Sequence, residues 1–295
     1  AKKADVVLLY IGLDEISESE GLDRSNMKLP ESQIRLLQMV SDANPHVVAV
    51  LSGGSPIEMP WIGQCEAMIH GYLSGQAGAA AMLNAILGKV NPSGKLNETY
   101  PLAYEAVPSA PYFPSRERNA EYREGLYVGY RYFETVGKPV RFPFGYGLSY
   151  TTFTYSDLTV NEQEASFTLA NTGEMDGAET AQLYVRTKCS GVYRPAKELK
   201  GFRKVFLKAG ESQKVTIPLD DKAFRYFNET TGRFEVEGGE YEILIGASCA
   251  DIRLSAAVTA AGSEAPLPRD ITRLPSYQSG NILAVSDQEF QVLLG

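Results

Sequence analysis

Residues 6–24 read VVLLYIGLDEISESEGLDR, and the fold of the first part of the chain is decided here. The aliphatic run from Val6 to Ile11 ends in Gly12, and such a run predicts a strand that is buried on both faces. The acids that follow therefore lie just past the carboxyl end of a strand, where open α/β sheets bind their ligands. This position favours a functional site. The alternative is an ordinary solvated loop made of Asp14, Glu15, Glu18, Glu20 and Asp23.

The composition is that of a soluble globular protein. The 295 residues suffice for about two domains, and 44% of them are hydrophobic and 22% charged. A net charge of -8 argues against a nucleic-acid partner and against an anionic membrane surface, and it favours a neutral or cationic ligand. The sequence contains neither a signal-peptide pattern at its start nor an apolar run of roughly 18 residues. We therefore expect a soluble protein, and the sequence leaves open whether it is cytoplasmic or secreted.

The cysteines and histidines do not predict a metal or cofactor site. Cys65, Cys189 and Cys249 are widely spaced, so we expect free and mostly buried thiols. His46 and His70 are expected to have structural roles. A calcium site on the acidic loop is a further alternative, although the spacing of the acids does not fit an EF-hand.

Strand and helix signals alternate over the first 100 residues, which is typical of a layered α/β domain. Pro30 begins a helix that continues to Asn44, and residues 47–51 form a second buried strand. A third strand is expected near residues 67–72, and an Ala-rich helix over 79–87 ends at Gly88. The glycines of SGGSP at 52–56 allow either a plain turn or an anion cradle. We prefer the turn, because no phosphate-loop motif follows.

Residues 101–143 are rich in proline, tyrosine and charge, with little periodicity. This segment is too long for a simple connector. Its second half is rich in aromatic residues, at positions 122, 127, 130, 132 and 133. Aromatic residues at this density are typical of a sugar-stacking wall or of a packed interface, and we prefer the interface.

From about Thr151 the pattern changes to short strands of period two, seen at 181–186, 214–219 and 241–245 and separated by turns. Apolar and polar residues alternate along these strands, so one face of each strand is apolar and the other polar. The pattern therefore predicts half-buried strands in an antiparallel sandwich of about 100 residues. A polar linker then leads to the capping-box pattern Ser286 to Glu289 and an apolar run over 290–294. A helix this short must dock on another part of the protein to be stable.

Several ordered blocks resemble glycoside hydrolase family 3, the β-glucosidase and β-xylosidase group, over residues 1–261. The blocks are ESEGLDR at 18–24 with MKLP at 27–30, SGGSPIEMPW at 52–61, GYLSGQAG at 71–78, LGKVNPSGKL at 87–96, REGLYVGYRYF at 123–133 and FPFGYGLSYTTFTYS at 142–156. RPAKELKGFRKV at 194–205 resembles the fibronectin type III-like module of that family.

The resemblance implies a partial α/β three-layer sandwich over 1–150 that carries the acid/base loop and lacks its N-terminal strands. It further implies an all-β fibronectin type III-like sandwich over 151–261 and a C-terminal extension over 262–295 that docks on the rest of the enzyme. The implied activity is a retaining hydrolysis by two carboxyl groups. In the family the nucleophile is an Asp on a (β/α)8 barrel, and these residues contain no such repeats. We therefore expect a barrel from another chain or from the rest of a cut polypeptide.

The resemblance places the general acid/base on the acidic loop. Alignment on the preceding strand selects Glu18, which we prefer, and alignment on the pair Asp23 and Arg24 selects Glu20. Neighbouring carboxylates favour the protonated form that a general acid needs, and a guanidinium opposes it. Asp23 and Arg24 are expected to organise the loop as an ion pair. Tyr127 and Tyr130 are weaker candidates for contact with the substrate.

The expected function is hydrolysis of a β-glucoside or oligosaccharide, with no cofactor, no nucleic acid and no membrane partner. β-Glucosidase is preferred within the family, and β-xylosidase or N-acetylglucosaminidase are alternatives. A non-catalytic carbohydrate-binding or scaffold protein that retains the fold is the alternative from another class.

Overall fold

The computed structural model describes residues 1–115, 118–188, 190–220 and 222–295. They form two compact units, one of residues 1–90 and 100–110 and the other of residues 91–99 and 111–295. The expected α/β elements lie in the first unit, and the expected sandwich and tail lie in the second. Segments 91–99 and 111–150 thus cluster with the sandwich. Cys189 lies outside the described residues.

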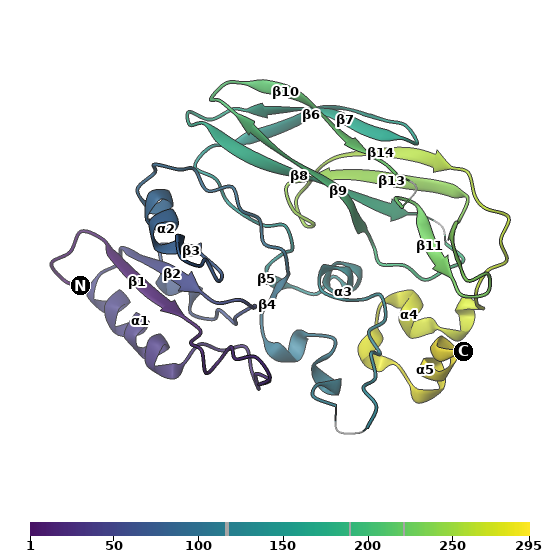
Figure 1. Cartoon of the computed structure of the whole chain (residues 1–295), viewed down its shortest axis with the longest axis horizontal. Helices are drawn as coiled ribbons and strands as arrows, with labels where there is room; N and C mark the ends of the chain where they lie inside the picture. Colours follow the sequence, from purple (N-terminus) through teal and green to yellow (C-terminus); the bar gives the residue numbers. More distant parts are fainter. Residues whose placement is uncertain (116–117, 189, 221) are drawn as a thin grey trace. The chain divides into compact units, whose positions relative to one another are not determined.

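The first unit is built on a three-stranded parallel sheet of order β1-β2-β3, as the alternating pattern predicts (Figure 1). Its strands are β1 (Val7–Gly12), β2 (Val47–Ser52) and β3 (Ala67–His70). Helices α1 (Glu31–Ala43) and α2 (Gly78–Ile86) flank the sheet, so the sheet and its helices form layers. The shorter elements are η1 (Ile62–Gln64), β4 (Tyr100–Pro101) and η2 (Tyr104–Ala106).

The central strand and the first helix follow directly from the sequence. The interior of β2 is inaccessible to solvent at Val47, Ala49, Val50 and Leu51, as the aliphatic run predicts. Pro30 precedes the first turn of α1, where its missing N–H costs nothing, and Leu37 carries the apolar face of the helix into the core.

The prediction that the first strand is buried on both faces is wrong for this chain. Leu9 and Ile11 are buried, but the side chain of Tyr10, on the opposite face, is 59% exposed. Strand β1 lies at the edge of the sheet, and the described residues do not cover its second face. An aliphatic sequence cannot reveal this, because the run reads alike whether or not a layer covers each face.

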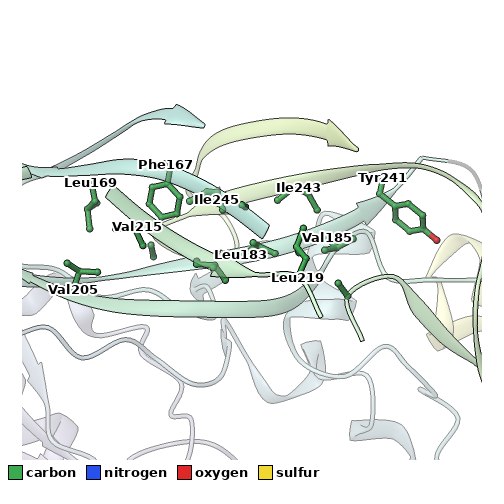
Figure 2. Packing of buried hydrophobic residues seen from close by; sticks show 14 of the residues in the cluster. Phe167, Leu169, Leu183, Val185, Val205, Val215, Leu219, Tyr241, Ile243 and Ile245 are labelled. Carbon is green, nitrogen blue, oxygen red and sulfur yellow. The ribbon is translucent and has the colours of Figure 1, made fainter. Parts of the chain in front are cut away.

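The second unit contains an antiparallel sandwich, as the period-two runs predict. One sheet has the order β10-β7-β6 and the other β14-β13-β8-β9, while β11 and β12 form a separate hairpin. The side chains of the two sheets meet in one core, seen in Figure 2 around Phe167, Leu183 and Ile243. The strands are β6 (Phe153–Val160), β7 (Glu164–Asn171), β8 (Gly177–Thr187), β9 (Glu198–Leu207), β10 (Ser212–Pro218), β11 (Arg225–Asn228), β12 (Arg233–Val236), β13 (Gly239–Gly246) and β14 (Ile252–Ala260).

Strand β8 is buried on both faces, so the prediction of a half-buried strand is wrong there. Gln182 and Tyr184, expected on the polar face, are 3% and 0% exposed. The segment before the sandwich covers them: Gln182 donates to the carbonyl of Gly145 at 3.1 Å, and Phe144 packs against the cluster that contains Tyr184. A local sequence pattern does not show such packing, because the covering residues lie far away in the same chain.

The remaining elements of the second unit are helical, apart from β5 (Val140–Phe142). They are η3 (Ala110–Tyr112), α3 (Tyr130–Val136), η4 (Ile271–Arg273), α4 (Pro275–Ser279), η5 (Ile282–Ala284) and α5 (Asp287–Leu294). Ser286 caps α5 by accepting from the N–H of Glu289 at 3.2 Å, as expected, but the Glu289 carboxylate instead accepts from the N–H of Ser276 at 2.7 Å. Phe290 of α5 is buried beneath the Arg123 guanidinium, 4.9 Å from the ring centre.

The two cysteines that the structure describes are free thiols, as expected. Cys249 is buried, and burial together with the nearby Glu134 raises its pKa to about 12. Cys65 is half-buried, and burial raises its pKa as well. Both thiols therefore remain protonated near neutral pH.

Candidate functional site

The candidate site lies where strands β1 and β2 end together. Gly12 and Ser52 are partners in the parallel register, so the loops that follow both strands leave from the same edge of the sheet. The approach at this edge is close: a Cβ on Gly12 would lie 2.1 Å from the Ser52 carbonyl oxygen. Glycine is therefore required at this position.

A side chain from α1 fixes the end of β1. The Gln33 amide accepts from the Gly12 N–H at 2.9 Å and donates to the Gly12 carbonyl at 2.9 Å. The chain then turns around Asp14, whose carbonyl accepts from the N–H groups of Ser17 and Glu18, each at 3.0 Å. The Asp14 carboxylate also accepts from Ser17, and these hydrogen bonds lower its pKa. The turn positions Glu18 to meet the loop that follows β2.

Both carboxylate oxygens of Glu18 are bound by that second loop. Oε2 accepts from the Gly54 N–H at 2.8 Å, and Oε1 accepts from the Ser55 hydroxyl at 2.5 Å. The plain turn preferred for residues 52–56 is therefore incomplete as a description. The loop does cradle an anion, but the anion is a carboxylate of the same chain rather than a phosphate.

Arg24 extends the same network. Its Nη1 donates to the Ser55 hydroxyl at 2.7 Å, so one serine joins the guanidinium to Glu18. Burial lowers the pKa of Arg24, and the charge of Glu18 opposes this effect. Within the described residues, Arg24 Nη2 is buried without a hydrogen-bond partner. Asp23 is exposed, and the ion pairs of the described ranges include none between Asp23 and Arg24.

Glu20 has a different environment from Glu18, although only one residue separates them. Its side chain is exposed, whereas that of Glu18 is half-buried. No hydrogen bond or ion pair in the part of the chain that the structure describes engages the Glu20 carboxylate. Gly21, which follows it, has a positive φ of 79° and lies in open space. The two glutamates thus divide into one bound to its own chain and one presented to the solvent.

His70, at the end of β3, lies at the same edge of the sheet. Its Nε2 is 2.7 Å from the Tyr100 hydroxyl, and its ring lies 4.0 Å from the ring of Tyr72. Burial lowers the pKa of His70, while the Leu51 carbonyl and the charge of Glu18 oppose this shift. Tyr72 itself has a positive φ of 51°, which is uncommon for a residue with a side chain. These contacts agree with the structural role expected for this histidine.

Tyr127 and Tyr130 are held in the interior of the second unit. Tyr127 is 0% exposed, and its hydroxyl donates to the Tyr277 carbonyl. The Tyr130 hydroxyl accepts from the Leu199 N–H at 2.8 Å, and its ring stacks on Phe144 at 4.8 Å. In this arrangement both side chains pack and hydrogen-bond within the unit, and their expected contact with the substrate stays a prediction.

Two further observations delimit the site. In the ranges that the structure describes, no three side chains of the His, Cys, Asp and Glu types gather so that they could hold a metal ion. The helices of these ranges also include none with the length and hydropathy of a membrane span.

The fold defines a class of protein, an α/β domain with a candidate site at one edge of its sheet followed by an antiparallel β-sandwich. The model of the glycosyl hydrolase family 3 C-terminal domain matches residues 1–150, and that of the fibronectin type III-like domain matches residues 179–249. The chain therefore belongs to glycoside hydrolase family 3, as the sequence blocks predict.

Named relatives cover nearly the whole chain. Thermostable beta-glucosidase B of Acetivibrio thermocellus is 46% identical over 88% of this chain and 35% of its own length. Exo-alpha-(1->6)-L-arabinopyranosidase of Bifidobacterium breve is 46% identical over 89% of this chain and 35% of its own length. The chain thus spans about a third of the length of these relatives.

Solved structures agree with this assignment. The family 3 beta-glucosidase of Bifidobacterium adolescentis has a TM-score of 0.87 and 45% identity, over 91% of this chain and 41% of its own. The beta-glucosidase of Kluyveromyces marxianus in complex with glucose has a TM-score of 0.84 and 39% identity, over 88% of this chain and 32% of its own.

Sequence reasoning missed the residues that hold the site together. The local sequence predicts a plain turn at Gly54 and Ser55, whereas the contact of Ser55 with Glu18 spans 37 residues of sequence. A signal existed, because neighbouring parallel strands that end in register bring their following loops together. That rule would have directed attention from the acidic loop to SGGSP.

Proposed function

We propose that this chain is the acid/base-bearing part of a retaining β-glycosidase of family 3. The substrate would be a terminal β-D-glucosyl residue, and the nucleophilic Asp would come from a barrel portion of the complete enzyme. Retention requires two carboxyl groups about 5 to 5.5 Å apart, one as nucleophile and one as proton donor. Relatives named beta-glucosidase support the reaction, and the edge of the sheet supplies the acid.

The assignment of the proton donor rests on the contrast between the two glutamates. A general acid must offer its proton to the glycosidic oxygen from a carboxyl oxygen that the protein does not already engage. Both oxygens of Glu18 accept hydrogen bonds from Gly54 and Ser55, whereas the exposed Glu20 carboxylate has none with the described residues. We therefore assign Glu20 as the general acid/base and Glu18 as a positioning residue.

This assignment reverses the preference for Glu18 that follows from alignment on the preceding strand. The alignment on the preceding strand uses only the number of residues after the strand. It contains no information on the contacts of each carboxylate. The ion pair expected between Asp23 and Arg24 is not among the ion pairs of the described residues, so we assign no role to the exposed Asp23, and we propose that Arg24 organises the loop through Ser55.

The test uses the complete enzyme and two aryl β-glucosides, one with a good and one with a poor leaving group. Glu20→Ala should lower kcat for poor leaving groups by about 10²–10⁴, because they need protonation, and should affect good leaving groups much less. Azide should restore the turnover of Glu20→Ala and give a glycosyl azide of retained configuration. Glu15→Ala, an exposed acid of the same loop, is the matched control and should remain active.

Other outcomes would decide between the alternatives. Azide rescue of Glu18→Ala but not of Glu20→Ala would return the role to Glu18. Full activity in both variants would favour the non-catalytic carbohydrate-binding or scaffold alternative. The 295-residue chain without the barrel should not hydrolyse the substrate, and turnover by this preparation would contradict the proposal.

The relatives suggest two candidate sugars for the substrate of the complete enzyme. The relatives named as a beta-glucosidase and as an arabinopyranosidase have the same 46% identity to this chain. Aryl β-glucoside and aryl α-L-arabinopyranoside should therefore be compared side by side, and we propose the glucoside as the better substrate of the complete enzyme.

A further inference from the structure

A cavity of about 530 Å³ lies within the second unit, in the sandwich and the segment that follows it. The hairpin β11-β12, the loop over residues 191–195 and residues 268–274 form its walls. This volume lies in the range of small-molecule sites, about 300 to 1,000 Å³.

The charge of the cavity is opposite to that of the chain. Five cationic side chains line it against two carboxylates, an excess of three positive charges in a protein of net charge -8. The cations are Arg194, Lys200, Lys222, Arg225 and Arg269. The carboxylates are already engaged: Glu229 binds Arg269, and Glu198 lies 3.4 Å from Lys200 and 3.7 Å from Arg131. An anion would find a favourable field in this cavity.

Arg194 is the most buried of these cations, with a side chain 9% exposed. Its Nε is buried without a hydrogen-bond partner among the described residues, and its two terminal nitrogens reach the Phe224 carbonyl only at 3.4 Å. The nearest carboxylate oxygen, on Glu237, is 3.9 Å away. The Tyr226 ring also faces the guanidinium at 5.3 Å, so the ring and Glu237 stabilise this buried charge in part, and a bound anion would complete its compensation.

Lys200, which also lines the cavity, is a second cation whose charge is incompletely compensated. Its side chain is 16% exposed, and burial lowers its pKa even though Glu198 and its hydrogen bond oppose the shift. The attraction of Glu198 therefore does not fully offset the loss of hydration. An anionic ligand beside Lys200 would supply the missing compensation.

Aromatic rings complete the cavity and narrow the class of ligand. Phe227 and Phe234 line it with 52% and 57% of their surface exposed, and their rings meet at 74°. The two rings contact each other edge to face with 5.3 Å between their centres, and the Arg225 guanidinium lies over the Phe234 ring at 4.3 Å, so Phe227 offers the more open apolar surface to a ligand. The apolar face of a sugar packs well against such a surface.

We propose that this cavity binds a short acidic saccharide, whose carboxylate pairs with Arg194 and Lys200 and whose ring packs on Phe227. The choice of a saccharide rests partly on the proposed function, while the choice of an anion rests on the charges alone. The site would select acidic oligosaccharides although the chain as a whole is acidic.

The test is calorimetric titration of the 295-residue chain with two matched disaccharides. Glucuronosyl-β-1,4-glucose and cellobiose differ only in a carboxylate that replaces a hydroxymethyl group. The acidic disaccharide should bind at least about tenfold more tightly, as expected for hydrogen bonds to charged groups. Inorganic phosphate should bind more weakly than the acidic disaccharide, because it has no ring to pack.

Variants on one strand locate the site. Lys200→Gln should weaken binding of the acidic disaccharide about tenfold, whereas Lys204→Gln, an exposed lysine of the same strand outside the cavity, should leave it unchanged. Lys222→Gln is a second test in an exposed side chain that carries little risk to folding, and it should weaken binding by a smaller factor.

Several results would overturn the inference. These are equal binding of both disaccharides, no binding of either, or equal effects of Lys200→Gln and Lys204→Gln. Phosphate binding as tight as that of the acidic disaccharide would reduce the site to one for simple anions and would refute its saccharide part. Because binding is measured without turnover, failure here leaves the role of Glu20 untouched, and loss of that role leaves this site untouched.

Discussion

The hydroxyl of Ser55 connects two charged groups, and its removal should measurably weaken the first unit. It donates to Glu18 at 2.5 Å and accepts from Arg24 at 2.7 Å. Hydrogen bonds to charged groups contribute about 1.5–3 kcal/mol when buried, and the half-buried setting places the expected loss in Ser55→Ala near the middle, about 2 kcal/mol. With a urea m-value of about 2 kcal/mol per molar, the midpoint should fall by about 1 M.

The chain offers a selective probe for this measurement. Trp61 is its single tryptophan, is 4% exposed and lies in the first unit, so its fluorescence reports the unfolding of that unit. Ser25→Ala, an exposed serine of the acidic loop, is the control and should leave the midpoint unchanged. A Ser55→Ala midpoint equal to that of the control would refute the argument that this network holds the loop.

A double-mutant cycle separates the pair from its surroundings. If Glu18 and Ser55 stabilise each other, Glu18→Gln combined with Ser55→Ala should cost at least about 1 kcal/mol less than the two single losses together. Strictly additive losses would mean that the two side chains act independently despite their distance.

The remaining predictions concern a titration, a close contact and a docked helix. Because burial lowers the pKa of His70 below its ordinary value of 6.5, the unfolded chain binds more protons, so the first unit should be most stable above that pH and weaken as pH falls through it. In Trp61-monitored urea unfolding, His70→Gln should reduce this acid loss and His46→Gln should not. Gly145→Ala should destabilise the second unit by more than about 2 kcal/mol in calorimetry, because φ is 81° and the new Cβ would lie 2.1 Å from Gln182 Oε1. Arg123→Ala should raise amide exchange in α5 about tenfold without changing β13, because the guanidinium binds Asp287 and covers Phe290.

Much of the fold was predictable because local patterns decide it. Strand β2 is aliphatic and buried at Val47 and over residues 49–51, and α1 begins after Pro30 and ends near Asn44, as period and capping signals indicate. The sandwich strands follow from period-two alternation. Tyr10 and Gln182 were predicted wrongly for one shared reason: whether a face is covered depends on residues far away in sequence, and a local pattern does not contain them.

The place of the candidate site was predictable as well, whereas its internal contacts were not. The rule for strand ends located the acidic loop, but the roles of its members depend on partners from another loop. Asp23 and Arg24 are adjacent and oppositely charged, so the sequence alone predicts an ion pair between them. Arg24 instead reaches Ser55, because that hydroxyl already carries the negative field of Glu18.

The environments of Glu18 and Glu20 imply that their removal will fail in different ways. Glu18 is joined to the second loop by two hydrogen bonds, so its loss should lower both the stability of the first unit and the turnover of the complete enzyme. The Glu20 carboxylate makes no hydrogen bond or ion pair with the described residues, so its loss should lower turnover while the Trp61 unfolding midpoint stays unchanged. A proton donor that makes no hydrogen bond with its loop can be replaced without disturbing the loop that positions it. Replacement of a positioning residue disturbs that loop. If Glu20→Ala shifted the midpoint as far as Glu18→Ala, this division of roles would have no physical basis.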